Sequence, residues 1–349
     1  MSDQLTGVPA GPGRLPTVSV VIAAFTMDRW AELQAAVASV RSQTISMPEV
    51  IVVIDHNPDL LARARRMLSG VTVVANAAGR GASGSRNTGV AASRAQVVAF
   101  LDDDAVASPA WLESMLGHFG DPRVVGVGGH VDPLWECRQP RWFPPEFGWA
   151  VGVSYRGMPQ AASPVRNVWS GNMVIRRDVF DAIGGFRAGF GKVGGRSSPE
   201  DTDLCMRASA AFDRGVWIYE PNGRAWHRVP ASRATPGFFL RRCFREGRGK
   251  AALAALNGTA ESTGVERRYV RRFLPAGIAH GLREALRGDL SGGLRSAAMG
   301  LGLSSVVAGY LTERYGGIVT RNGTAVARPR SRDVLAARRE GGARRADSR

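Results

Sequence analysis

The segment Val97-Val98-Ala99-Phe100-Leu101-Asp102-Asp103-Asp104 runs from an apolar stretch directly into three consecutive aspartates. Residues 96–101, which are apolar from Val97 onward, predict a buried strand. Three adjacent carboxylates at the end of a strand repel one another unless a cation sits among them. On an extended backbone the first and third side chains point the same way, which suits a divalent ion bound by Asp102 and Asp104. A solvated acidic turn or a helix cap is the alternative.

Short apolar stretches alternate with amphipathic ones around this segment, as in strand-helix-strand units. Buried strands are expected at residues 18–24, 50–54, 71–75 and 96–101, and helices at 29–43, 58–68, 83–93 and from 109 onward. Four such units in succession predict an α/β domain with a mainly parallel sheet.

The second half of the chain has a different pattern. Beyond Val131 the sequence predicts long loops that line a substrate cleft, with the aromatic residues Trp135, Trp142, Phe143, Phe147, Trp149 and Tyr155. A helix is expected over residues 199–213, a strand over 217–220, and arginine-rich helices beyond Pro236. The chain then divides into a disordered lead-in (1–16), an α/β domain (17–235), a basic helical region (236–316) and a disordered basic tail (317–349).

The 349 residues carry a formal charge of +16, and 44 of the 46 basic residues are arginine because Lys192 and Lys250 are the only lysines. No nucleic-acid motif accompanies the charge, so we expect no nucleic-acid partner. Three widely spaced cysteines without a CxxC pair indicate neither a disulfide framework nor a zinc site. Residues 1–16 do not read as a secretory signal, and residues 296–312 fall short of the roughly 20 apolar residues that a spanning helix needs. We therefore expect a cytoplasmic protein.

The helices expected between residues 238 and 315 place arginines among Phe, Leu and Val. Such a surface suits an anionic membrane, and the protein would then be peripheral on the inner face of the plasma membrane. Helices packed on the α/β domain, with their charged face in water, fit the pattern equally well.

Two further motifs are expected near the acidic triplet. Asp55 ends the second strand. A carboxylate there can accept a hydrogen bond from a nucleoside or cap the following turn. Residues 79–84, Gly-Arg-Gly-Ala-Ser-Gly, satisfy GxGxxG, but they follow the third strand rather than the first, which argues against a nicotinamide site. The glycines instead allow a loop to pass close to a nucleotide and begin the helix that carries Arg86 and Asn87. Arg86 then contacts the nucleotide or forms a structural salt bridge.

Together these motifs resemble glycosyltransferase family 2, whose catalytic domain has the GT-A fold. The resemblance rests on residues 18–24, Asp55, Gly84-Ser85-Arg86-Asn87-Thr88-Gly89, Phe100 to Asp104 and Pro199-Glu200-Asp201, and it spans roughly residues 18–230. It implies a Rossmann-like α/β domain, here with a C-terminal helical appendage. It also implies a metal-dependent transfer of a sugar from a nucleotide sugar to an acceptor hydroxyl, with inversion and with Mn²⁺ or Mg²⁺ as the metal.

The resemblance also implies roles for single residues. Contacts to the nucleotide sugar fall on Asp55, Arg86, Asn87, Asp102, Asp103 and Asn172, and the metal ligands fall on Asp102, Asp104 and His227. Asp201 becomes the catalytic base, and Glu200 binds acceptor hydroxyls. Without the resemblance, His227 would fit a packing role, and the Glu-Asp pair would fit the first turn of a helix, where acidic residues are favoured. The Asp-Gly-Ser usual in the family is replaced by Asp55-His56-Asn57-Pro58.

Residues 55–58 together with residues 100–105 are similar to a branch that acts on dolichyl-phosphate-linked sugars with glucuronate as donor. This implies a UDP-linked donor and a carbohydrate or lipid-linked glycan as acceptor. Arg177, Arg187 and Arg196 either bind a sugar carboxylate or are surface arginines.

Two other function classes remain as alternatives. A sugar-phosphate nucleotidyltransferase would carry a glycine-rich basic loop after its first strand, and Ala23-Ala24-Phe25-Thr26-Met27 is no such loop. A non-catalytic module that binds nucleotides or carbohydrates would not need both Asp104 and Asp201.

Overall fold

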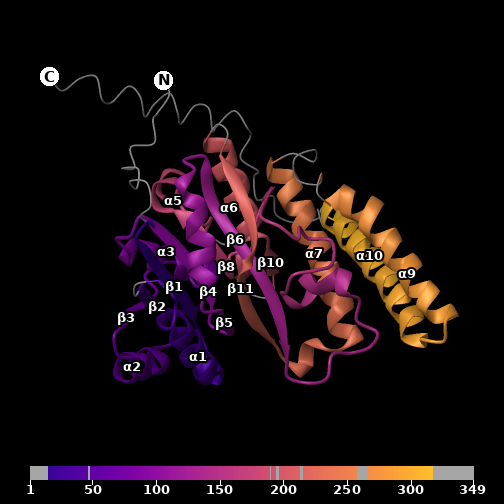
Figure 1. The fold of residues 1–349 in the computed structure, drawn as a ribbon, viewed down its shortest axis with the longest axis horizontal. Helices are drawn as coiled ribbons and strands as arrows, with labels where there is room; N and C mark the ends of the chain where they lie inside the picture. The colour runs from indigo at the N-terminus through magenta and orange to yellow at the C-terminus, as the bar shows by residue number, and fades with distance from the viewer. Residues whose placement is uncertain are drawn as a thin grey trace, which may run out of the picture.

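The computed structural model describes residues 15–45, 48–188, 190–193, 196–212, 215–257, 264 and 266–316. Within these residues nine strands form one mixed sheet, in the order β3-β2-β1-β4-β8-β6-β11-β5 with β7 paired to β11 (Figure 1). The sheet and its flanking helices confirm the predicted α/β class. The disordered ends expected at 1–16 and 317–349 lie outside the described residues, except for Leu15 and Pro16.

The first half of the chain follows the predicted succession of units. The elements are β1 (Val18–Ala24), η1 (Met27–Arg29), α1 (Trp30–Arg41), β2 (Glu49–Ile54), α2 (Pro58–Met67), β3 (Thr72–Ala75), α3 (Ala82–Ala92) and β4 (Val97–Asp102). These four strands pair in parallel. β1, β2 and β4 are almost continuously apolar because helices cover both faces of the sheet.

The middle of the chain holds more strand than the sequence predicts. Its elements are β5 (Ala105–Ala107), α4 (Trp111–Leu116), η2 (Gly117–Gly120), β6 (Val124–Trp135), η3 (Pro145–Val151), β7 (Ser163–Val165), β8 (Asn172–Arg176), α5 (Arg177–Ala182), β9 (Gly191–Val193), β10 (Arg196–Ser198), α6 (Glu200–Ala211) and β11 (Val216–Val229). The strand expected at 217–220 continues past Pro221-Asn222-Gly223 because these turn-forming residues make a bulge within β11. Likewise, loops were expected from Val131, but β6 extends to Trp135 along β11.

The C-terminal region is helical, as predicted. It comprises η4 (Ala231–Arg233), α7 (Pro236–Asn257), the π-helical turn η5 (Tyr269–Phe273), α9 (Leu274–Leu286) and α10 (Leu290–Gly316). In Figure 1, α7 lies beside the sheet, and α9 and α10 form a hairpin on its outer side. Among the described residues, none of the helices has the length and apolar character required to cross a membrane.

Buried side chains form three clusters. One lies between the sheet and α1, α2 and α4. The second lies on the opposite face, under α3, α5 and α6. The third joins η3, α7, α9 and α10 to the ends of β6 and β11, and includes Phe147, Phe239 and Met299. The helical appendage is therefore packed onto the α/β domain through a core of its own.

The parallel register brings the acidic residues of two strands to one edge. Ala24 of β1 pairs with Ile54 of β2, and Ala23 of β1 pairs with Asp102 of β4. Asp55, which follows β2, and Asp102 therefore lie at the same carboxyl edge, as predicted. Ligands of open α/β sheets bind at this edge.

Candidate functional site

A cavity of about 1580 Å³ lies at this carboxyl edge and continues under the C-terminal helices. It is lined from the α/β side by Asp55, Arg86, Asp102, Asp103, Asp104, Asn172, Glu200, Asp201 and His227. From the other side it is lined by α7, η5 and α10. Drug-sized ligands occupy cavities of roughly 300–1,000 Å³, so this one has room for two substrates.

Asp102, Asp104 and His227 come together in the wall of the cavity. Asp102 ends β4, Asp104 lies in the turn before β5, and β5 pairs with β11 so that His227 faces Ala105. The three side chains each offer a ligand atom, and these atoms lie within 4.8 Å of one another. Nε2 of His227 is 3.3 Å from Oδ1 of Asp104, while the buried Nδ1 has no hydrogen-bond partner. This donor set of two carboxylates and one imidazole fits a divalent metal ion.

The middle aspartate of the triplet has a different environment. Nη1 of Arg29 lies 2.9 Å from Asp103 and 3.0 Å from Asp104, so one guanidinium holds the turn between β4 and β5. Burial raises the pKa of Asp103 to about 7, despite Arg29. Burial also favours the neutral form of Asp104, but His227 and Arg29 outweigh it and lower the pKa of Asp104 to about 2. Asp104 is thus ionised at neutral pH, as a metal ligand should be.

Asp55 is already committed to contacts within the chain. Its Oδ1 accepts from Asn76 Nδ2 at 2.7 Å, and its Oδ2 accepts from the backbone N–H of Gly81 at 2.8 Å. His56, which adopts a left-handed φ of 50°, also hydrogen-bonds to Asp55. These bonds fix the glycine loop against the end of β2 and lower the pKa of Asp55 against the opposing effect of burial. In this chain, where His56-Asn57-Pro58 follow Asp55 in place of Gly-Ser, the Asp55 carboxylate thus holds part of the cavity wall in place.

Arg86 connects the two acidic motifs of the cavity. Its Nη2 donates to Oδ1 of Asp102 at 2.9 Å, and its Nη1 lies 3.5 Å from Oε1 of Glu200. The side chain is buried and its guanidinium lies over the Phe186 ring. α3 thus holds the end of β4 and the start of α6 at a fixed separation.

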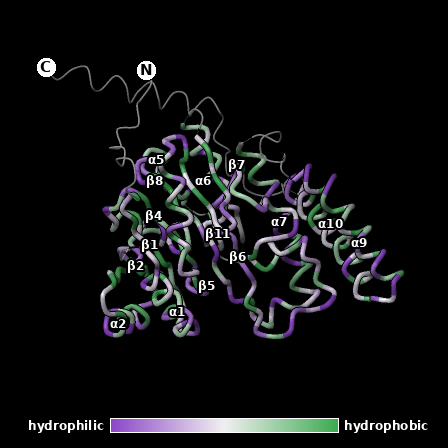
Figure 2. Tube along the Cα trace, in the orientation of Figure 1, coloured by the Kyte–Doolittle hydropathy of each residue, from purple (hydrophilic) through white to green (hydrophobic). Residues whose placement is uncertain are grey.

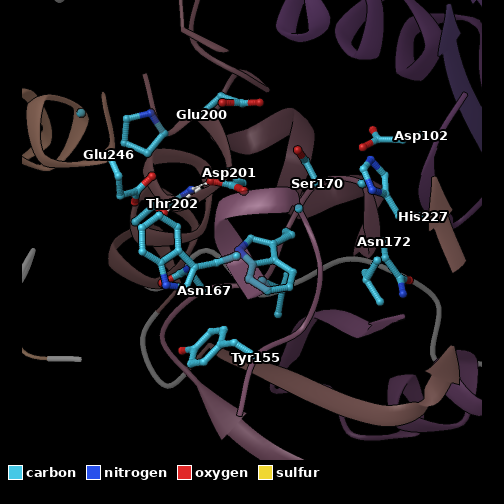
Figure 3. A pocket seen from close by; sticks show the side chains of 18 of the residues that line it. Asp102, Tyr155, Asn167, Ser170, Asn172, Glu200, Asp201, Thr202, His227 and Glu246 are labelled. Carbon is cyan, nitrogen blue, oxygen red and sulfur yellow. Dashed lines mark hydrogen bonds between the residues drawn. The ribbon is translucent and has the colours of Figure 1, made fainter. Parts of the chain in front are cut away.

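Asp201 lies in the first turn of α6 and points into the cavity. Its Oδ1 accepts from the backbone N–H of Thr202 at 2.7 Å, and its Oδ2 makes no hydrogen bond with the described residues. In Figure 3, Asp201 lies between Glu246 on one side and Asp102 with His227 on the other. Burial raises the pKa of Asp201, and the charge of Glu246 adds to this effect.

The side-chain amides of Asn87 and Asn172, which were predicted to contact the nucleotide sugar, form hydrogen bonds within the protein. Oδ1 and Nδ2 of Asn87 bind the backbone of Phe186, and Asn87 does not line the cavity. Asn172 does line it, but its Oδ1 accepts from Trp111 Nε1 at 2.7 Å and its Nδ2 donates to carbonyls of β6 and β11. Asn172 therefore ties β6 and β11 together.

The arginines considered for a sugar carboxylate are engaged elsewhere. Arg177 pairs with Asp181 at 2.8 Å, and Arg187 pairs with the buried Asp203 at 3.1 Å. Neither lines the cavity. The side chain of Arg196 lies outside the described residues.

A second arginine that the sequence did not single out, besides Arg29, lies near the charge of Asp104. Arg233, in η4 just after β11, lines the cavity and donates to the carbonyl of Val151 at 3.4 Å. No carboxylate of the described residues pairs with it. Burial lowers the pKa of Arg233, and the nearby charge of Asp104 opposes this. A cation beside the metal ligands suits an anionic group of a substrate.

The sequence also did not predict that α7 forms part of the cavity wall. Lys250 lies 2.7 Å from Glu266 and 3.6 Å from Glu246, and Arg166 forms two hydrogen bonds to Glu266. Lys250 and Arg86 oppose the raised pKa of Asp201. The one available signal was that Lys250 is one of two lysines in an arginine-rich chain.

The aromatic residues expected in a cleft separate into two groups. Phe147, Trp149 and Tyr155 line the cavity, together with Trp169 and Tyr269. Trp135, Trp142 and Phe143 pack instead in the core beneath α7.

Comparison with known proteins supports this description. Residues 19–184 match the profile described as Glycosyl transferase family 2. The chain is 32% identical over 244 residues to the glucosyl-dolichyl phosphate glucuronosyltransferase of Haloferax volcanii, covering 68% of this chain and 78% of that protein. It is 36% identical over 143 residues to the pre-mycofactocin glycosyltransferase of Mycobacterium tuberculosis, covering 41% and 29% of the two chains.

A solved structure shares the fold. The mannosyltransferase PcManGT from Pyrobaculum calidifontis, in complex with GDP-Man and Mn²⁺, matches with a TM-score of 0.54 and 15% identity over 87% of this chain and 89% of that one. At this identity the likeness shows the fold alone, and it confirms the expected GT-A architecture.

Proposed function

Because the chain belongs to glycosyl transferase family 2, we propose that it is an inverting transferase that moves a sugar from a UDP-linked donor to an acceptor hydroxyl. One observation carries this proposal. A metal-ligand group, Asp102, Asp104 and His227, shares one cavity with a carboxylate, Asp201, that has an unengaged oxygen. A binding module has no need of the second feature.

Asp102, Asp104 and His227 would hold the metal. A bound divalent ion neutralises charge on the departing diphosphate. Carboxylates suit both Mg²⁺ and Mn²⁺, while an imidazole ligand favours Mn²⁺, so we propose Mn²⁺ as the working ion. Asp103 stays with Arg29 and keeps the turn in place.

Asp201 would be the general base. The N–H of Thr202 fixes its Oδ1, which leaves Oδ2 to accept the proton of the acceptor hydroxyl as that oxygen attacks the anomeric carbon. The C–O bond to the diphosphate breaks on the opposite side of the sugar, which inverts the anomeric configuration. Glu200, held by Arg86, would orient the acceptor hydroxyls.

Arg233 and Arg86 would stabilise the leaving diphosphate. Arg233 reaches the metal-ligand group from η4, and Arg86 reaches it from α3. Fixed cations aimed at developing negative charge lower the barrier without reorganising during the reaction. Asp55 and the glycine loop that it fixes would form the wall beside the nucleoside.

The acceptor side of the cavity suits an amphiphile. It is lined by Val270 and Phe273 from η5 and by Leu303 and Val306 from α10, beyond the polar groups near Asp201. The name of the Haloferax relative supports a glucuronate donor and a lipid-phosphate-linked sugar as acceptor. Such an acceptor would bring the protein to the inner face of the plasma membrane.

A donor panel tests the proposal. Purified protein is incubated with Mn²⁺ or Mg²⁺, a lipid-phosphate-glycan extract and a series of UDP-, GDP- and dTDP-sugars, and nucleotide release is measured. We expect release from a UDP-sugar that is faster with Mn²⁺ and is abolished in Asp104→Asn. No release from any donor, or equal release by Asp104→Asn, would refute the function. NMR of the product should show the anomeric configuration opposite to that of the donor.

A further inference from the structure

The α9–α10 hairpin leaves a row of leucines exposed on its outer side. Leu286 and Leu290, on either side of the turn, are 89% and 77% exposed, and Leu294 and Leu301 of α10 are 56% and 59% exposed. Leu290, Leu294 and Leu301 share one face of α10 because they are four and eleven residues apart. We name these four leucines the hairpin face.

The rest of α10 strengthens this pattern. No charged residue occurs from Ser296 to Thr312, although much of the helix is exposed. Its opposite side packs on α7 and α9 through small residues such as Gly292, Gly302 and Gly309. Figure 2 shows hydrophobic colouring along α10. Contiguous apolar surfaces of this kind mark interaction sites.

Arginines stand beside the hairpin face. Arg283 of α9 and Arg287, the residue that follows α9, come one residue after Leu282 and Leu286 and are exposed. Neither pairs with a carboxylate among the described residues. Glu284 and Asp289 both pair with Arg295, so these three residues together carry a formal charge of −1. Arg283 and Arg287 bring the formal charge of the five residues to +1. The charge that remains next to the leucines is therefore positive.

The hairpin that carries these leucines also contributes to the cavity wall. Phe273, just before α9, lines the cavity and is exposed at the surface, and Leu303 and Val306 of α10 line it as well.

We propose that the hairpin face docks on an anionic lipid bilayer, with the leucines inserted at the level of the headgroups and Arg283 and Arg287 on lipid phosphates. A second copy of this chain is the competing occupant. A two-fold contact through this face would bring the unpaired arginines of both copies together, which is unfavourable. The bilayer as the source of the acceptor rests on the proposed function, whereas the docking does not.

Vesicle co-sedimentation of the full-length protein tests the docking. The probes are phosphatidylcholine vesicles with and without phosphatidylglycerol. Wild-type protein should sediment with the anionic vesicles and be released by salt. Leu294→Asp with Leu301→Asp should lower the partition coefficient about tenfold or more, since inserted apolar area drives such binding. Arg283→Gln with Arg287→Gln should weaken binding to the anionic vesicles alone.

Leu134→Asp is the matched control, because Leu134 is 54% exposed on β6, away from the hairpin. It should bind vesicles like wild type. The far-ultraviolet circular dichroism spectrum and the midpoint of urea unfolding should match wild type in every variant, which shows that each is folded. Binding that is absent in wild type, or equal in the leucine variants, would overturn the proposal. So would a wild-type dimer that becomes monomeric in Leu294→Asp with Leu301→Asp. Vesicle binding without nucleotide release would instead refute only the proposed function.

Discussion

Nε2 of His227 lies 3.3 Å from Oδ1 of Asp104, although the two residues are far apart in the sequence. The pairing of β5 with β11 creates this contact, since it sets His227 opposite the residue that follows Asp104.

We expect His227→Ala to weaken Mn²⁺ binding in the presence of UDP. Loss of an outer-shell partner costs about 10- to 100-fold in metal affinity, and a direct ligand should cost at least as much. Isothermal titration with Mn²⁺ measures the effect. His280→Ala, on the exposed surface of α9, should leave the affinity unchanged. Unaltered Mn²⁺ affinity in His227→Ala would exclude the histidine from the metal site.

The dependence of kcat on pH should reveal the neighbours of Asp201. Because the pKa of Asp201 is raised, kcat should fall on the acid side at a pH above the ordinary range of an aspartate. Lys250→Met removes a cation that favours the carboxylate, so the acid limb should move to higher pH. Glu246→Gln removes an anion, so the limb should move to lower pH. If the acid limb moved in the same direction in both variants, or in neither, the charges of Lys250 and Glu246 would not control the pKa of Asp201.

Arg233→Ala should weaken the binding of UDP but not that of uridine. A hydrogen bond to a charged group contributes about 1.5–3 kcal/mol, which corresponds to a loss of about 10- to 100-fold. Equilibrium binding of the two ligands in the presence of Mn²⁺ separates diphosphate recognition from nucleoside recognition. Arg241→Ala is the control, because Arg241 is exposed on α7 and does not line the cavity. Equal losses for UDP and uridine would count against a diphosphate contact.

Gly309 allows α10 to lie directly against α7. A Cβ at Gly309 would overlap the carbonyl oxygen of Phe244, and a Cβ at Gly247 would overlap that of Val306. Gly309→Ala should therefore lower the free energy of unfolding by about 1–3 kcal/mol, as overpacking does. Urea unfolding measures it. Gly300→Ala, on the open side of the same helix, should instead stabilise by up to about 1 kcal/mol. Equal effects of the two substitutions would mean that the close approach is unimportant.

The first half of the fold was predictable because its strands are buried on both faces and read as continuous apolar runs. The strand expected at residues 18–24 is β1 to the residue. β11 was cut short in the prediction because Pro221 and Gly223 signal a turn, and only pairing with β6 keeps the chain extended beyond them. β8 was missed because Asn172 begins it, and the hydrogen bonds that satisfy this amide come from α4, β6 and β11, which are distant in the sequence.

The candidate site divides in the same way. Asp102, Asp104 and Asp201 carry signals within their own segments. Arg29 and Arg233 carry none, and Lys250 is marked only by the rarity of lysine in the chain, because the importance of all three comes from charges brought close by tertiary packing. Asn87 lies in a recognisable motif, but its side-chain amide hydrogen-bonds to the backbone of Phe186.

The proposed function requires Asp201 to act as the base of a glycosyl transfer at this cavity. Its most direct measurement compares Asp201→Asn with wild type, using the active donor at saturating acceptor, alongside the Kd for UDP. We predict that kcat falls by roughly 10²- to 10⁴-fold while the Kd for UDP is unchanged. Asp181→Asn, on the surface of α5, should match wild type. A kcat close to that of wild type in Asp201→Asn would show that Asp201 is not the base.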